Sequence, residues 1–152
     1  MIVAVLDTPV GRLGVREDAG AITRLTWDME AEGEVTPLLS EALSQLAAYF
    51  DGRLRDFDLP LRVGGSDFQR AVCAAMSAIP LGETRTYGEI ARAVGRPAQA
   101  VGSACGGNPI PIIIPCHRVL GAGGKMVGFS GAGGVETKVW LLRHEGAAGL
   151  LI

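Results

Sequence analysis

Residues 108–119 read NPIPIIIPCHRV, an apolar isoleucine run that leads directly into a cysteine and a histidine. A cysteine becomes a strong nucleophile as its thiolate, which proteins produce near neutral pH with a neighbouring base that is itself oriented by a carboxylate. Cys116 is therefore a candidate nucleophile, and His117 is a candidate base that acts directly or through a water. Consecutive side chains of an extended segment point in opposite directions, so a turn is needed to bring the two groups together. The alternative is a buried, proline-flanked cysteine beside a surface histidine.

Upstream of this stretch, the sequence predicts two short helices around a tight turn. Thr86 and Glu89 have the spacing of a capping box, which marks the start of the first helix, and Gly95 interrupts it. Pro97 suits the first turn of the second helix, and the glycines at 106–107 can end that helix in a left-handed conformation. The pair forms a helix-turn-helix, a pattern typical of DNA-binding proteins but also of helices that only pack together.

The second of these helices carries almost no side chains that could read base edges. Its small residues are Ala98, Ala100, Gly102, Ser103 and Ala104. Reading of the major groove through hydrogen bonds is therefore not expected. Small residues let a backbone approach closely, which favours insertion along the minor groove, where sequence discrimination is poor. An ordinary packing face of alanine and glycine is the alternative.

The first part of the chain predicts a small lobe with a sheet and one helix. Short β-type runs that indicate an antiparallel meander lie at 2–6, 13–16 and 22–27. Thr36 offers an N-cap for an amphipathic helix that reaches Phe50. A proline and a glycine pair within 58–65 mark a boundary, so we expect one lobe at 1–60 and a second at 61–152. The second lobe opens with a helix between a serine cap and a terminating proline.

The composition favours a soluble protein with an asymmetric charge. The 152 residues are 48% hydrophobic and carry a net charge of −2. Residues 1–60 hold 5 basic and 11 acidic groups, whereas residues 61–152 hold 9 and 5, so the second half could face phosphates or could simply be solvated. No apolar stretch approaches the roughly 20 residues of a membrane span, and no signal peptide is evident. We expect three reduced cysteines, a cytoplasmic location and no membrane partner.

Motifs spread over the second lobe match one known family. Besides the opening stretch they are Asp67-Phe68-Gln69, Ile79-Pro80, Gly82-Glu83-Thr84, Thr86-Tyr87-Gly88, Ala100-Val101-Gly102, Gly128-Phe129-Ser130-Gly131, Trp140-Leu141-Leu142 and His144-Glu145-Gly146. The sequence resembles the O6-alkylguanine-DNA alkyltransferases, which are methylated-DNA–protein-cysteine methyltransferases; the first lobe matches them only in outline. The resemblance implies an α/β (α+β) fold, in which a ribonuclease-H-like sheet-plus-helix lobe precedes a mostly helical, winged helix-turn-helix-like alkyltransferase domain.

The resemblance implies single-turnover DNA repair without a cofactor. Cys116 would attack the O6-alkyl carbon of a flipped guanine and keep the group as a thioether, with O4-alkylthymine as a second candidate substrate. His117 corresponds to the base, acting through a water, and Glu145 to the acid that holds the imidazole. Asn108 matches a hinge asparagine that ties the DNA-binding helices to the active-site segment. Tyr87 matches the tyrosine that contacts the guanine edge and helps it to depart.

The resemblance also assigns binding positions. The substrate pocket would comprise Tyr87, Val119, Phe129, Ser130 and Lys138. The DNA-binding positions would be Arg96, Ala98, Gln99, Ala100, Gly102, Ser103 and Arg118. Gln99 departs from the family, which usually has there an arginine that enters the base stack; Arg96 could substitute for it or bind phosphate. The implied partner is double-stranded DNA bearing O6-alkylguanine, bound through the minor groove by a monomer.

Two other functions use the same residues. A damage-sensing alkyltransferase-like protein shares the fold but replaces the nucleophilic cysteine, so Cys116 argues against it. A Cys-His-Glu hydrolase would use the same triad, but it does not need a helix-turn-helix. The zinc site of some relatives is not expected, because residues 1–60 contain neither cysteine nor histidine. Cys73 and Cys105 are expected as packing residues, and His144 is expected to face outward near a helix end.

Overall fold

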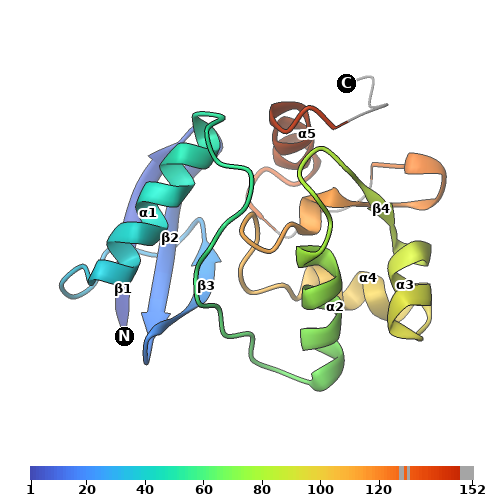
Figure 1. Ribbon diagram of the computed structural model, residues 1–152, viewed down its shortest axis with the longest axis horizontal. Coiled ribbons are helices and arrows are strands. Elements are labelled where there is room, and N and C mark those ends of the chain that lie inside the picture. The colour runs from blue at the N-terminus through green and yellow to red at the C-terminus, as the bar shows by residue number, and fades with distance from the viewer. Residues whose placement is uncertain (127–128, 130, 148–152) are drawn as a thin grey trace. The chain divides into compact units, whose positions relative to one another are not determined.

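The computed structural model describes residues 1–126, 129 and 131–147, and it divides into two compact units, Met1–Val63 and Gly64–Ile152. Each unit has its own helices and strands, drawn in Figure 1.

The first unit is a three-stranded antiparallel sheet with one helix packed against it (Figure 1). Its elements are β1 (Ile2–Thr8), β2 (Gly11–Asp18), β3 (Ala21–Thr26) and α1 (Pro37–Phe50). The hairpin between β2 and β3 turns through Ala19 and Gly20, which both have positive φ, as tight hairpins with right-twisted strands require. Helix α1 begins where the sequence predicts, because the Thr36 hydroxyl accepts a hydrogen bond from the Leu39 amide and Pro37 occupies the first turn.

The second unit is mostly helical. Its elements are α2 (Asp67–Ser77), β4 (Arg85–Thr86), α3 (Tyr87–Val94), α4 (Ala98–Gly106), the 3-10 turn η1 (Cys116–Arg118), β5 (Val119–Leu120), the 3-10 turn η2 (Ala122–Gly124) and α5 (Val135–His144). Helices α2, α3 and α4 pack on one another. Strands β4 and β5 pair in parallel, with Arg85 opposite Val119 and Thr86 opposite Leu120. This pairing sets the first residue of α3 beside the segment that follows η1.

Local capping signals place the helices of the second unit. Ser66 caps α2 by accepting from the Gln69 amide, and the capping box of Thr86 and Glu89 is present at α3. Gly95 ends α3 at φ 70°, a left-handed conformation that costs glycine little. These three predictions are confirmed.

Both ends of α4 differ from the expectation. Pro97 is the N-cap, one residue before the helix, rather than part of its first turn. Gly107 ends the helix at φ −90° and ψ 7°, which is not left-handed. The reason lies in the next turn, where the Gly107 and Asn108 amides donate to carbonyls only three residues back, at Ala104 and Cys105. The chain tightens into a 3-10 turn instead of reversing through a left-handed glycine.

The isoleucine run forms the core between α4 and η1. Ile110, Ile112 and Ile114 are all at most 2% exposed. Ile112 has φ 73°, a left-handed conformation that is rare and strained for a β-branched residue. Such a backbone persists only where its surroundings hold it, so this segment is under local constraint directly before Cys116.

Candidate active site

The turn that the Cys-His pair requires is present at η1. Cys116, His117 and Arg118 form one 3-10 turn, in which the Arg118 amide donates to the Pro115 carbonyl at 3.0 Å and the Val119 amide donates to the Cys116 carbonyl. All three residues are buried, and the His117 side chain is 0% exposed. The alternative of a surface histidine is therefore wrong.

His117 is held by a carboxylate from the end of α5. Glu145 is the C-cap residue of α5, and its Oε2 lies 2.6 Å from His117 Nε2. The predicted His117–Glu145 contact is thus formed although 27 residues separate the two in the chain. In the described part of the chain, Nδ1 on the other side of the ring has no hydrogen-bond partner. The imidazole is oriented by one nitrogen and can exchange a proton at the other.

The charges around this pair set its protonation. Burial lowers the pKa of His117 below its usual value, although the hydrogen bond and charge of Glu145 act in the opposite direction. Burial by itself would raise the pKa of Glu145, but the contacts with His117 and Arg118 lower it to about 2. The site therefore combines a neutral imidazole with an ionised carboxylate at physiological pH.

The structure does not support the assignment of Arg118 to the DNA-binding positions. Its side chain was expected at the DNA surface, but it is 8% exposed. Its guanidinium donates to both oxygens of Glu145 and to the Ile79 carbonyl. A buried carboxylate needs compensating donors, and Arg118 supplies them, so its guanidinium belongs to the active-site cluster, defined here as Cys116, His117, Arg118 and Glu145.

Other groups of the second unit lie within electrostatic reach of Cys116. Burial, together with the charges of Cys116 and Cys73, raises the pKa of Cys105 to about 12. Burial also raises the pKa of the half-buried Tyr87, with smaller effects from Cys105 and Cys116. Burial lowers the pKa of Lys138 to about 8, against the opposing charges of Cys116 and Cys105. Tyr87 and Lys138 therefore share the surroundings of Cys116, as the resemblance implied, and Cys105 joins them.

The proximity of Cys105 to Cys116 was not foreseen. Cys73 and Cys105 are buried, as expected of packing residues. The signal that could have found Cys105 is helical phase, because it follows the buried Ala104 on the inward side of α4, four residues after the buried Val101.

Two buried polar side chains tie the active-site segment to its surroundings. Asn108 Nδ2 donates to the Ile114 carbonyl at 2.9 Å, and its Oδ1 accepts from the Ile110 amide at 3.0 Å. These bonds close the isoleucine run into a loop. Lys138 Nζ donates to the carbonyl of Val119 at 2.6 Å, and both residues are almost fully buried.

Comparison with known proteins identifies the family. Residues 67–147 match the 6-O-methylguanine DNA methyltransferase DNA-binding domain, and residues 1–63 match the ribonuclease-like domain of 6-O-methylguanine DNA methyltransferase. A methylated-DNA–protein-cysteine methyltransferase of Mycolicibacterium paratuberculosis is 44% identical over 149 residues, 92% of this chain and 89% of that protein. One from Methanosarcina acetivorans is 41% identical over 159 residues, 97% of this chain and 99% of that protein. The chain belongs to the 6-O-methylguanine DNA methyltransferase family.

A solved structure supports the same conclusion. The crystal structure of Mycobacterium tuberculosis OGT in complex with DNA aligns with a TM-score of 0.83 at 44% identity, covering 93% of this chain and 91% of that one. The predicted fold class is confirmed, with a ribonuclease-like lobe followed by a helical DNA-binding domain.

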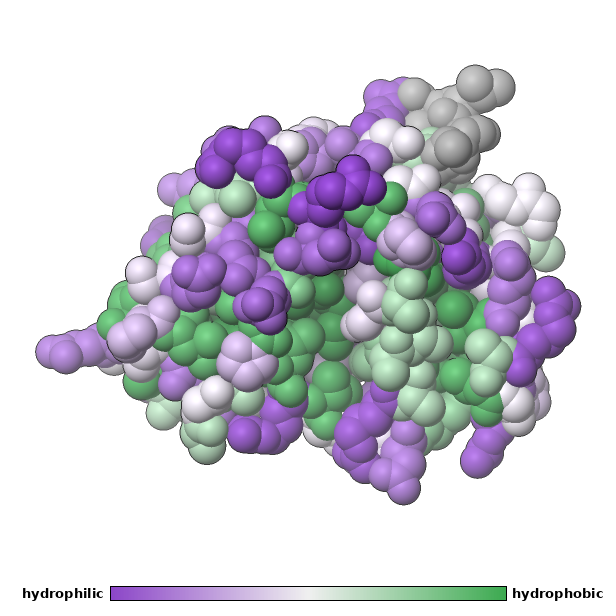
Figure 2. All heavy atoms as spheres, viewed as in Figure 1, coloured by the Kyte–Doolittle hydropathy of each residue, from purple (hydrophilic) through white to green (hydrophobic). Residues whose placement is uncertain are grey.

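Helix α4 presents an exposed, uncharged face in this methyltransferase-family domain. Ala98, Gln99 and Ser103 are exposed, and Ala100 and Gly102 are half-buried. A methyl group built on Gly102 would contact nothing within 4 Å, so this part of the helix is open. We call Ala98, Gln99, Gly102 and Ser103 the α4 surface. The hydropathy colouring of Figure 2 mixes polar and apolar residues over the face in view and singles out no broad patch.

Arg96, at the turn before α4, is already in contact with a neighbouring helix. Its guanidinium carbon lies 5.5 Å from the centre of the Phe68 ring of α2, a cation–π arrangement. Arg96 is also exposed. Arg96 is thus close to Gln99 in the sequence, but its guanidinium stacks on the Phe68 ring of the protein.

Three further positions named from the sequence are Phe129, Ser130 and His144. Phe129 is half-buried, whereas Ser130 lies outside the described residues. His144 is half-buried at the end of α5 and stacks on Trp140 rather than facing outward alone.

Within the residues that the structure describes, no group of three or more histidine, cysteine or acidic side chains could hold a metal. No helix among them is long and apolar enough to cross a membrane.

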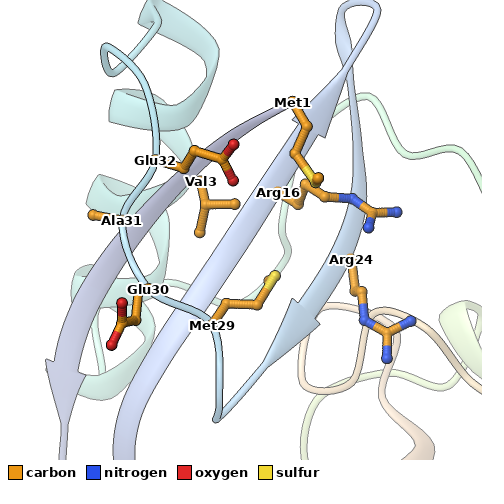
Figure 3. A pocket seen from close by; sticks show the side chains of 8 residues that line it. All are labelled: Met1, Val3, Arg16, Arg24, Met29, Glu30, Ala31 and Glu32. Carbon is orange, nitrogen blue, oxygen red and sulfur yellow. The ribbon is translucent and has the colours of Figure 1, made fainter.

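A pocket of about 650 Å³ lies in the first unit, and none of its lining residues belongs to the active-site cluster. It is lined by residues of the three strands and of the segment after β3, with Arg16 and Arg24 together with Glu30 and Glu32 around it (Figure 3). Its lining holds neither a cysteine nor a histidine. This pocket therefore has no nucleophile or base for alkyl transfer.

Proposed function

We propose that this chain repairs DNA by direct reversal, transferring the alkyl group of O6-alkylguanine to Cys116. The observation that carries this proposal is the buried His117–Glu145 contact at 2.6 Å, set directly after a buried cysteine by one 3-10 turn. The relatives' names favour alkyl transfer over the two alternatives, a damage sensor without strong transfer and a hydrolase.

The reaction needs one proton transfer and one substitution. The Cys116 thiol passes its proton, through a bridging water, to His117 Nδ1, while Nε2 stays hydrogen-bonded to Glu145. The sulfur electron pair then forms a bond to the alkyl carbon as the bond from that carbon to O6 breaks. Guanine leaves as an anion, whose departure Tyr87 assists from the guanine edge. The thioether is not hydrolysed, so each molecule acts once.

DNA is bound by the second unit in this proposal, and the chemistry and the DNA contacts fall within residues 61–152. The α4 surface enters the minor groove, because its small side chains permit a close approach of the backbone. The target guanine leaves the base stack to reach Cys116, as enzymes that modify a base require. Val119, Phe129, Ser130 and Lys138 form the pocket for the base. Asn108 links this pocket to α4 through the loop that it closes.

The cellular setting follows from the chemistry. A thiol nucleophile that is used once must stay reduced, which favours the cytoplasm. The proposed partner is double-stranded DNA bearing O6-alkylguanine, with O4-alkylthymine as a second candidate, and the protein acts as a monomer. The first lobe, residues 1–60, carries none of the proposed reacting groups.

Intact mass after incubation with an oligonucleotide containing O6-methylguanine tests this function. We expect the mass to increase by one methyl group, mapped to Cys116, with no more than one equivalent transferred per protein molecule. Cys116→Ala should show no increase. Cys73→Ala and Cys105→Ala are matched controls that remove buried thiols and should retain the transfer. Several turnovers per molecule, or a methyl group on another residue, would contradict the proposal.

A further inference from the structure

Arg118 links the active-site turn to two segments that are distant in the chain. Its Nε donates to Glu145 Oε1 at 2.8 Å and its Nη2 donates to Oε2 at 3.1 Å. Its Nη1 donates to the carbonyl of Ile79, just beyond α2, at 2.6 Å. Two parallel hydrogen bonds between a guanidinium and a carboxylate fix both the position and the orientation of the carboxylate.

Glu145 is therefore shared between two potential cations. Its Oε2 lies 2.6 Å from His117 Nε2 and 3.1 Å from Arg118 Nη2. A buried carboxylate beside a lone histidine favours the protonated imidazolium, because the opposite charges attract in a poorly solvated site. A permanent cation on the same carboxylate offsets that attraction, since Arg stays charged at all relevant pH values.

We propose that Arg118 is a positioning residue of the alkyl-transfer site. It fixes both oxygens of Glu145 and offsets their charge, so that His117 rests as a neutral imidazole able to accept the Cys116 proton. The inference rests on the proposed function of Cys116. Without Arg118, the charge of Glu145 would favour the protonated form of His117, and less of the base would be free to accept a proton when the substrate arrives.

The charged groups that face His117 agree with this role. Burial lowers the pKa of His117, Glu145 raises it through a hydrogen bond and its charge, and Arg118 and Lys138 lower it through their charges. Cys116 adjoins His117 in the same turn. Lys138 is occupied by the Val119 carbonyl, whereas Arg118 contacts Glu145 itself. Arg118 is thus the cation that acts on the histidine through its carboxylate.

The test follows the titration of His117 by NMR in histidine-labelled protein, alongside the pH dependence of single-turnover transfer from O6-benzylguanine. The chain has two histidines, so His144→Gln assigns both signals. In Arg118→Met we expect the titration midpoint of His117 to rise by about one pH unit. The pH at which the transfer rate falls on the acid side should rise by the same amount. Arg118→Lys keeps the charge but loses the two-point contact, so it should slow transfer and leave the midpoint near that of the wild type.

Two further variants separate this role from a structural one. Arg143→Met removes an exposed arginine two residues before Glu145 and should move neither midpoint nor acid limb. Arg118→Met combined with Glu145→Gln removes both charges and avoids an uncompensated carboxylate if the single variant does not fold. Its His117 midpoint should lie at or below the wild-type value, because Arg118 acts through Glu145.

The outcomes distinguish the two proposals. The inference is overturned if the His117 midpoint is unchanged in Arg118→Met, or if it rises as much when Glu145→Gln is also present. If wild-type protein transfers no methyl group from O6-methylguanine in DNA, the proposed function fails, whereas the NMR midpoints still decide how Arg118 acts on His117.

Discussion

The active-site cluster and the α4 surface belong to the same unit and are built in opposite ways. In the cluster, the side chains of His117 and Glu145 are at most 1% exposed, and Glu145 is bound by both His117 and Arg118. On the α4 surface, the uncharged Ala98, Gln99 and Ser103 are exposed, and a methyl group built on Gly102 would meet nothing within 4 Å. The cluster depends on exact partners within the protein, whereas the surface depends on a partner outside it. Substitutions in the active-site cluster should change the stability of the protein and the transfer rate on any substrate. Substitutions on the α4 surface should change the transfer rate only on duplex DNA.

The largest expected effect comes from removing the base or its carboxylate. In His117→Ala or Glu145→Gln, thiolate is no longer supplied by the relay, so transfer from O6-benzylguanine should slow by about 10²-fold or more. The pH profile should move upward, because reaction then depends on ionisation of a thiol without its base. Single-turnover rates between pH 5 and pH 9 measure both changes, with the pH range chosen to span the ordinary values of about 6.5 for His and about 8.5 for Cys.

Matched substitutions on α5 control for nonspecific damage. His144→Ala removes the chain's other histidine, and Glu136→Gln removes an exposed carboxylate in the first turn of the helix. Neither should slow transfer beyond what a small loss of stability explains. Unchanged pH profiles in both His117→Ala and Glu145→Gln would show that another group activates Cys116.

Asn108→Ala should give the next largest effect, on stability. The substitution leaves the buried Ile110 amide without its partner and removes one of two donors from the Ile114 carbonyl, which still accepts from the Cys116 amide. An unsatisfied buried polar group costs ~1–3 kcal/mol, and we expect a loss of that size in the free energy of unfolding. Urea denaturation measures it. Ser103→Ala, on the α4 surface, should stay within about 0.5 kcal/mol of the wild type, and an equal loss at both positions would remove the contrast between the two regions.

Lys138 should make stability rise with pH in the alkaline range. Burial holds the pKa of Lys138 in the folded protein at about 8, below its ordinary value of 10.5, so between these values the unfolded chain binds more protons than the folded one. Stability therefore increases as pH rises through this window, by about 1–3 kcal/mol from this group. Lys138→Met should lose that increase, whereas Lys125→Met, at the exposed second lysine, should keep it. Identical slopes in all three proteins would contradict this charge assignment.

Most elements could be predicted because their signals are local. Helix starts are predicted by N-cap residues within a few positions, at Thr36, at Ser66 and at the Thr86–Glu89 capping box. The structure has helices that begin at these places. The adjacency of Cys116 and His117 made them candidates, but the 3-10 turn that holds both is seen only in the structure. Glu145 came from the resemblance, because no local pattern links it to a histidine 28 residues earlier.

What the sequence did not reveal depends on packing. From the sequence, an arginine after Cys-His in a DNA-binding domain could contact either a DNA phosphate or a buried carboxylate. Only the direction of η1 in the structure shows that Arg118 contacts the carboxylate of Glu145. Cys105 and Cys116 lie within electrostatic reach of each other across a segment in which Ile112 has a positive φ, a backbone conformation that no local sequence pattern predicts. The predicted left-handed end of α4 was wrong because a glycine permits a left-handed conformation but does not require it.

The α4 surface gives the smallest and most selective prediction, at Gln99. Gln99 is exposed and occupies the position where the resemblance implies an arginine that enters the base stack. Extruding a base costs a few kcal/mol, and a side chain that fills the gap offsets part of this cost. An arginine offers planar stacking together with attraction to phosphate, whereas glutamine offers a planar amide without charge. Arg96, the other candidate for this role, stacks on Phe68 in the structure.

Gln99→Arg should therefore accelerate repair of O6-methylguanine in duplex DNA, by about tenfold or less, and leave the rate with O6-benzylguanine unchanged. The small substrate needs no extrusion, so it reports only on the active-site cluster. Gln99→Lys separates the effects, since it adds a charge without a planar group and should give a smaller gain. Rapid-quench transfer rates on both substrates measure the contrast. If Gln99→Arg leaves the duplex rate unchanged, or accelerates both substrates equally, Gln99 does not limit extrusion, and the α4 surface differs from the cluster in some other way than its dependence on duplex DNA.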